Sequence, residues 1–181
     1  MKVKIIGKEW KNLLLIAAIV LALNLPFIAK PMHLDDPLWI YTARWILKDP
    51  AHPYSYNREW PSQKGIATSL EDPPLISYYI ALVITLFGER EAALHISFMI
   101  FPLIAAISMY YLGKKFTRNP LNPALCLATS VVFVVMSNHI MQDIPVLSFI
   151  ILSLALFIYG VDCGKMGYYS SEVFLQALHS L

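Results

Sequence analysis

The sequence predicts an all-α membrane protein with about four transmembrane helices and a large first outer loop that carries juxtamembrane helices. Of its 181 residues, 57% are hydrophobic and only 14% are charged, whereas soluble domains average about 25% charged residues. The charged residues leave long gaps, each near the ~20 residues that a helix needs to cross a bilayer. Because backbone polar groups in lipid must be paired internally, we expect these gaps to be helices. This composition excludes a disordered chain, a nucleic-acid-binding protein and an ordinary soluble enzyme.

The predicted spans lie near residues 12–29, 92–113, 120–137 and 144–160. Lysines concentrated at the N-terminus place that end in the cytoplasm, by the positive-inside rule. Residues 30–91 then form an extracytoplasmic loop. A cleaved signal peptide is the alternative for the first span, since a basic segment precedes its apolar stretch. The length of that stretch and its poor cleavage site favour an uncleaved helix.

A further apolar stretch, Pro73–Phe87, lies inside the outer loop and is only 15 residues long. If it crossed the membrane, the basic cluster of Lys114, Lys115 and Arg118 would lie outside, against the charge rule. We therefore expect an interfacial or re-entrant helix. A second surface helix is predicted from Pro37 to Lys48, where tryptophan and tyrosine favour the headgroup layer.

Three acidic sites flank the predicted outer face: Asp35 with Asp36, Glu71 with Asp72, and Asp143. One interpretation is helix capping, because each site precedes a proline at an expected helix start and a cap contributes about 0.5–2 kcal/mol. The other interpretation is a functional site, because adjacent acids exceed what a cap needs and all of them lie on one side of the membrane. Clustered carboxylates raise one another's pKa, so one can act as a base while others bind a cation.

The ordered motifs resemble the integral-membrane glycosyltransferases of the protein O-mannosyltransferase and lipid A aminoarabinose transferase type, the C-type superfold. In that family an acidic pair follows the first span, as in His33-Leu34-Asp35-Asp36-Pro37. A Pro-Pro-Leu motif then precedes an aromatic-rich helix, like Pro73-Pro74-Leu75 with Tyr78-Tyr79. An acid-x-Pro motif begins a later span, like Asp143-Ile144-Pro145. The resemblance covers residues 12–159.

The resemblance implies transfer of a sugar from a polyprenyl-phosphate donor to a hydroxyl of a lipid, glycan or protein acceptor, on the extracytoplasmic face of the cell or inner membrane. No nucleic-acid partner is expected. Asp35 would be the catalytic base, and Asp36 would orient the acceptor or support the site. Glu71, Asp72 and Asp143 would bind the substrates or shape the site. Asp36 and Asp143 are the candidate ligands for a divalent metal ion near the donor phosphate.

Two cationic phosphate contacts of some relatives are missing from this chain. Asp72 stands where some relatives carry a lysine, and His95 stands where many carry an arginine. We interpret His95 as a packing or interfacial residue rather than a ligand. A metal ion, or another basic residue such as Arg58 or Lys64, would replace the missing cations.

The chain is shorter than members of this family, which usually have several hundred residues and more spans. We expect residues 1–161 to be the N-terminal transmembrane part of such an enzyme. Residues 162–181 would be a cytoplasmic tail, truncated or altered in reading frame after Gly160. Such a fragment would lack much of the lipid-binding half of the site and could be inactive alone.

Two other functions remain as alternatives. A small transporter, or a fragment of one, would need polar or broken helices near the bilayer midplane. In a non-catalytic membrane assembly subunit, replacing the acids by alanine would be silent.

Overall fold

The chain folds into a bundle of helices with a smaller helical unit beyond one end. The computed structural model describes the backbone of residues 2–32, 35–55, 57–60, 63–66 and 73–162. The elements in chain order are α1 (Lys2–Asn24), η1 (Leu25–Phe27), α2 (Asp36–Ile46), β1 (Asn57–Trp60), β2 (Gln63–Ile66), α3 (Leu75–Phe87), α4 (Glu91–Phe98), α5 (Ile100–Phe116), α6 (Leu121–Ala128), α7 (Val131–Ser137) and α8 (Asp143–Asp162). The predicted all-α membrane fold is confirmed, apart from the short antiparallel hairpin β1–β2, which the sequence did not predict.

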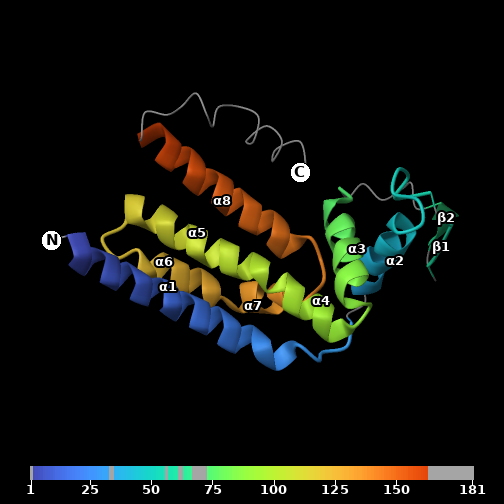
Figure 1. Cartoon of the computed structure of the whole chain (residues 1–181), viewed down its shortest axis with the longest axis horizontal. Coiled ribbons are helices and arrows are strands. Elements are labelled where there is room, and N and C mark those ends of the chain that lie inside the picture. Colours follow the sequence, from blue (N-terminus) through green and yellow to red (C-terminus); the bar gives the residue numbers. More distant parts are fainter. Residues whose placement is uncertain (1, 33–34, 56, 61–62, 67–72, 163–181) are drawn as a thin grey trace.

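The long helices alternate in direction along the bundle. Figure 1 shows α1, α5, α8 and the pair α6–α7 side by side, with α2, α3 and the hairpin beyond one end. Helix α5 is central, because it packs on α8, α6 and α1. We call the end next to α2 and α3 the α2 end; there α1 ends, and α4 and α8 begin. The opposite end, where α5 and α8 finish, carries Lys114 and Lys115 and is called the lysine end.

In the described part of the chain, three helices are long and apolar enough to cross a membrane: Glu9–Phe27, Glu91–Phe116 and Asp143–Asp162. They correspond to the first, second and fourth predicted spans. The second of them combines α4 and α5, which meet at Met99. Pro102 explains this junction, because proline has no N–H to donate to the carbonyl of Phe98.

The third predicted span, residues 120–137, is not one helix. Helices α6 and α7 are separated at Thr129 and Ser130, where Ser130 adopts an extended conformation with ψ of 130°. The Thr129 hydroxyl donates to the carbonyl of Leu125 at 2.8 Å, a local bond through which threonine competes with the regular helix. The count of four transmembrane helices is therefore not confirmed, although α6 and α7 together run beside α1.

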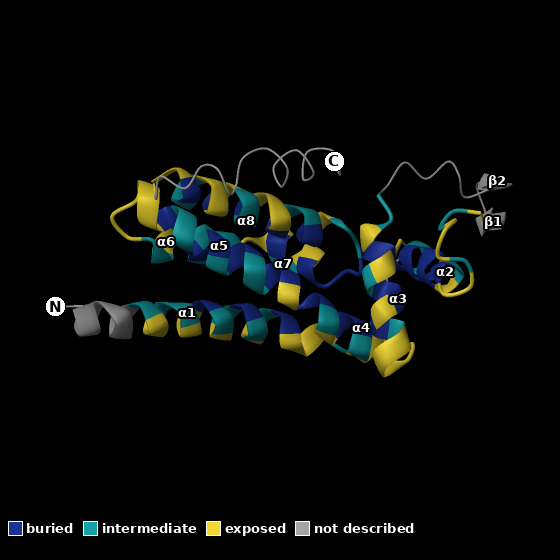
Figure 2. Ribbon diagram, turned by 45° about the horizontal axis from the view of Figure 1, so that its top comes forward, coloured by how far each residue is buried: buried dark blue, intermediate teal, exposed yellow. Residues whose placement is uncertain are grey.

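Apolar side chains fill the spaces between the helices in two clusters. One cluster gathers residues of α2, α3, α4 and α8, and the other lies between α1, α5 and α6. Figure 2 shows these buried faces turned toward one another and the exposed faces turned outward. Gly113 allows α5 to approach α6 closely, because a Cβ atom there would lie 2.8 Å from Pro123 Cγ.

Ion pairs join three helices at the lysine end. Lys114 of α5 pairs with Glu9 of α1, and Lys115 pairs with Asp162, the last residue of α8. The Lys115 ammonium also lies 4.3 Å from the ring centroid of Tyr159. These contacts hold the ends of α1, α5 and α8 together.

The small unit beyond the α2 end is built from α2 and α3, which pack on each other. The guanidinium of Arg44 on α2 pairs with the carboxylate of Glu89, just after α3. Helix α2 agrees with the helix predicted over residues 37–48, and its placement at the membrane surface stays a prediction. At 13 residues, α3 is a shorter apolar helix outside the set of candidate spans, and its interfacial or re-entrant placement stays a prediction. Residues 163–181 of the predicted tail lie outside the described residues.

Candidate active site

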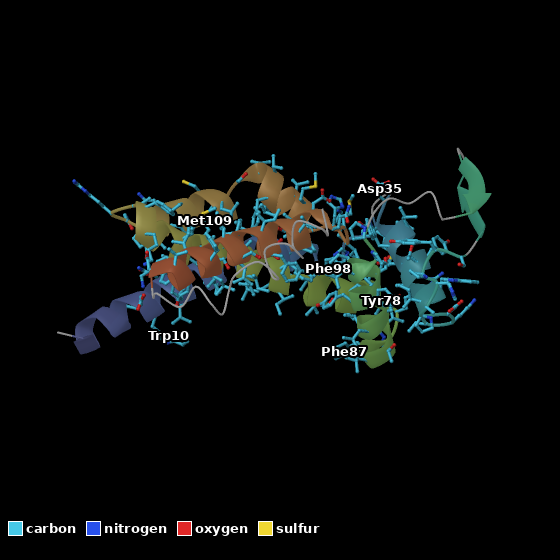
Figure 3. The ribbon with its side chains drawn as sticks, turned by 90° about the horizontal axis from the view of Figure 1, so that it is seen from above. Trp10, Asp35, Tyr78, Phe87, Phe98 and Met109 are labelled. Atoms are coloured by element: carbon cyan, nitrogen blue, oxygen red, sulfur yellow. The ribbon has the colours of Figure 1, made fainter. Side chains whose placement is uncertain are left out.

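The two acids of the Asp35-Asp36 pair have opposite surroundings at the start of α2. The Asp36 side chain is 0% exposed, and its Oδ1 accepts the backbone N–H of Ile140 at 2.9 Å. Asp35 is exposed at the N-cap position of α2, where its side chain makes no capping hydrogen bond. Figure 3 shows Asp35 at the α2 end, far from Trp10 on α1. Capping alone therefore does not explain this pair.

The Asp36 carboxylate connects two motifs that are distant in the sequence. Its partner Ile140 is 104 residues away, in the loop between α7 and α8. This loop leads directly to Asp143, the exposed first residue of α8. A buried backbone N–H needs a partner, and a charged acceptor gives one of the stronger hydrogen bonds. The fold thus ties the start of α2 to the segment that carries the acid-x-Pro motif.

A histidine and a lysine complete this buried polar cluster. His139 is 8% exposed, and its Nδ1 lies 3.8 Å from Asp36 Oδ1. The Lys30 ammonium lies 3.3 Å from both ring nitrogens of His139 and 3.5 Å from the carbonyl oxygen of Asn138. A neutral imidazole offers one acceptor nitrogen, so at most one of the two ring contacts is a hydrogen bond.

His95 is part of the wall of this cluster. It is a buried residue of α4, and its Nε2 lies 3.2 Å from the backbone carbonyl oxygen of Lys30. The contact holds the backbone at Lys30 against α4, which is the packing role that the sequence suggested for His95. Four chain segments therefore meet at the α2 end: the segment after α1, the start of α2, α4, and the loop before α8.

The roles of the remaining predicted site residues stay predictions. Glu71 and Asp72 lie outside the described residues, and the side chains of Arg58 and Lys64 are not described either. Within the described ranges, no group of three or more His, Cys, Asp or Glu residues is placed to hold a metal ion. The role of Asp36 and Asp143 as metal ligands stays a prediction.

Sequence reasoning missed Lys30 and His139 as members of the site. The signals were present but weak: Lys30 follows the first apolar gap, and His139 interrupts a long uncharged stretch shortly before Asp143. Their contact spans 109 residues, and nothing in the local sequence pairs two such positions.

Comparison with known proteins identifies the family of the chain. The model of the dolichyl-phosphate-mannose-protein mannosyltransferase family matches residues 71–179, more than half of the chain. The matched segment contains α3 to α8 and Asp143, and Asp35 and Asp36 precede it. Searches of curated proteins and of solved structures found no match. The resemblance inferred from the motifs is thus confirmed, and the chain belongs to the dolichyl-phosphate-mannose-protein mannosyltransferase family of membrane glycosyltransferases.

Proposed function

We propose that the α2 end transfers a sugar from a polyprenyl-phosphate donor to an acceptor hydroxyl, with Asp35 as the general base. The observation that carries this proposal is the contrast within the acidic pair. Asp35 is exposed and makes no capping bond, whereas Asp36 is fully buried and bound to the loop before α8. A carboxylate that approaches a substrate must be accessible, and its neighbours must hold it in position.

The chemistry needs one proton acceptor and one site for a leaving group. The Asp35 carboxylate accepts the hydroxyl proton of the acceptor as the acceptor oxygen attacks the anomeric carbon of the donor sugar. The bond between that carbon and the phosphate oxygen breaks, and the polyprenyl phosphate leaves with the electron pair. Positioned base catalysis contributes about 10²–10⁴-fold to such a step. Asp36 supports the site by holding the start of α2 against Ile140.

The membrane surroundings suit a lipid-linked donor. The candidate spans present exposed apolar side chains along their outer faces, such as Leu14, Phe149 and Leu154. A polyprenyl chain would lie in the hydrocarbon layer, with its phosphate at the level of the α2 end. The positive-inside rule puts Lys114 and Lys115 in the cytoplasm, so the α2 end would face outward.

The described residues alone do not form a site for a divalent metal ion. Hard cations such as Mg²⁺ and Ca²⁺ take several oxygen ligands, and the described residues hold no group of three candidate ligands. One oxygen of Asp36 already accepts the N–H of Ile140. Glu71 and Asp72 lie outside the described residues, so a metal-binding role of Asp36 and Asp143 stays a prediction.

The break between α6 and α7 is the kind of feature that the transporter alternative requires. Its polar groups are occupied locally, however, because the Thr129 hydroxyl donates to the carbonyl of Leu125 in its own helix. The family of the chain is one of glycosyltransferases. Both observations favour sugar transfer over transport.

The test measures sugar transfer by the full chain in lipid vesicles that contain dolichyl-phosphate mannose. Asp35→Asn keeps the size of the side chain and removes the base, so we expect the turnover rate to fall about 10²–10⁴-fold. Asp49→Asn is the matched control, because Asp49 is a partly exposed acid after α2 that contacts His52. Equal rates for the two variants would show that Asp35 is not the base.

A further inference from the structure

We propose that Lys30 is the residue that binds the phosphate of the lipid-linked donor, and that His139 and Asn138 hold its ammonium in place. This inference rests on the proposed function and names a residue that the sequence motifs did not suggest. It also supplies a cation where two phosphate contacts of some relatives are missing.

Lys30 differs from the cations that form ion pairs in the described part of the chain, and from the exposed cations that form none. Arg44 pairs with Glu89, Lys114 with Glu9, and Lys115 with Asp162. Lys30 is half-buried, and no described carboxylate pairs with its ammonium. Its described partners are an imidazole ring and a backbone carbonyl, which carry no full negative charge.

The surroundings of the Lys30 ammonium are energetically unfavourable without a ligand. Partial burial removes water from the ammonium, and a charge without a counter-ion in such a place is unfavourable. An anionic ligand would offset this cost when it binds. A lysine ammonium is a compact point charge with three donors, and it is a common phosphate-binding group in proteins.

The position of Lys30 in the chain also suits a lipid phosphate. Lys30 follows the first candidate span, which ends at Phe27, so it lies where a lipid phosphate would meet the protein. It also precedes the proposed base, Asp35, by five residues. Base and cation thus lie at the same end of the bundle, as attack and departure at one anomeric carbon require.

The Asp36 carboxylate does not pair directly with the Lys30 ammonium, so the ammonium can still bind a phosphate. The buried Asp36 carboxylate accepts the N–H of Ile140 and lies 3.8 Å from His139, and the same histidine ring contacts Lys30. The imidazole therefore contacts both groups, and the described structure contains no direct Lys30–Asp36 ion pair. His95 holds the Lys30 carbonyl on the other side.

The experiment measures equilibrium binding of farnesyl phosphate and of farnesol to the purified full chain in lipid nanodiscs. The two probes share an isoprenoid chain and differ in the phosphate. Lys30→Met keeps the length of the side chain and removes its charge. We expect at least about tenfold weaker binding of farnesyl phosphate and unchanged binding of farnesol, because only the phosphate loses a charge-assisted hydrogen bond.

Two further variants make the result specific. Lys30→Arg restores the charge, and we expect it to recover most of the preference for the phosphate. Lys48→Met removes an exposed lysine after α2 and serves as the matched control, with binding like that of the original chain. Inorganic phosphate as a competitor separates recognition of free phosphate from recognition of a lipid-linked one.

The outcomes separate this inference from the proposed function. If Lys30→Met binds farnesyl phosphate as tightly as the original chain does, the inference is overturned even where Asp35→Asn abolishes transfer. If Lys30→Met loses the phosphate preference and Asp35→Asn transfers sugar normally, the phosphate site stands and the proposed base falls. Loss of farnesol binding together with phosphate binding would indicate a general structural role for Lys30 and would also overturn the inference.

Discussion

The two ends of the helical bundle hold their charged residues in different ways. At the lysine end, Lys114 and Lys115 each have a carboxylate partner, and these ion pairs remain partly exposed. At the α2 end, Asp36 is fully buried and accepts a backbone N–H. The Lys30 ammonium there contacts the His139 ring and the carbonyl oxygen of Asn138. Exposed pairs of the first kind contribute little to stability, with a median near 0–1 kcal/mol. The second arrangement is costly without a ligand, which supports the proposal that the α2 end is the functional one.

The largest effect is expected from breaking the buried contact at the α2 end. Asp36→Ala leaves the N–H of Ile140 without its acceptor, so we expect a loss of about 3 kcal/mol in the free energy of unfolding. Asp36→Asn keeps an acceptor oxygen and should lose less. Unfolding of the full chain in mixed detergent micelles, followed by circular dichroism, measures both changes.

Asp35→Ala is the control for this prediction, because Asp35 is exposed and makes no capping bond. We expect a change below about 0.5 kcal/mol, as for most surface substitutions. An equal loss for Asp35→Ala and Asp36→Ala would contradict the difference that we assign to the two acids.

An intermediate effect is expected from overpacking near the lysine end. Gly113→Ala places a Cβ atom 2.8 Å from Pro123 Cγ and 3.2 Å from the carbonyl oxygen of Pro120. Because α5 and α6 must then move apart, we expect a loss of about 2 kcal/mol in the same unfolding measurement. The KM for sugar transfer at the distant α2 end should stay unchanged.

Gly88→Ala is the matched comparison, since Gly88 has open space around it but a positive φ of 76°. That substitution costs about 1–2 kcal/mol through backbone strain. If Gly113→Ala is neutral while Gly88→Ala destabilises, the close contact between α5 and α6 does not constrain the bundle.

The smallest effect is expected from an exposed ion pair placed near the α2 end. Arg44 lowers the pKa of the Glu89 carboxyl, chiefly through their side-chain hydrogen bond. A lowered pKa in the folded state adds stability above the unfolded pKa of about 4.3, and this stability is lost as the pH falls through the folded value. We expect Glu89→Gln to lower Tm slightly at pH 7 and to have a progressively smaller effect as the pH falls through the lowered pKa of Glu89.

A second ion pair of similar exposure, at the lysine end, separates the effect of solvent exposure from the effect of location in the bundle. Glu9→Gln, at the lysine end, removes a pair of similar exposure and should cost about as much at pH 7. A much larger loss for Glu89→Gln would mean that location at the α2 end makes even an exposed pair important.

Much of the architecture could be predicted from local sequence features. The uncharged stretches located the three candidate spans of the described residues, because the length of a hydrophobic stretch depends only on neighbouring residues. The helix α2 was also predicted, from its proline and the helical spacing of its aromatic residues. The break at Thr129 and Ser130 was missed, since two polar residues in an apolar stretch are compatible with a continuous helix until tertiary packing is known.

The sequence by itself determined the class of the protein, the positions of its acids and the order of its motifs, because these depend on composition and spacing along the chain. Tertiary structure alone decided which acid is buried and which cation joins the site. Asp36 meets Ile140 across 104 residues, and Lys30 meets His139 across 109. Contacts at such separations arise only when α1, α2, α4 and the loop before α8 are packed together. The physical cause is that burial and charge pairing belong to the assembled end of the bundle and not to any one segment.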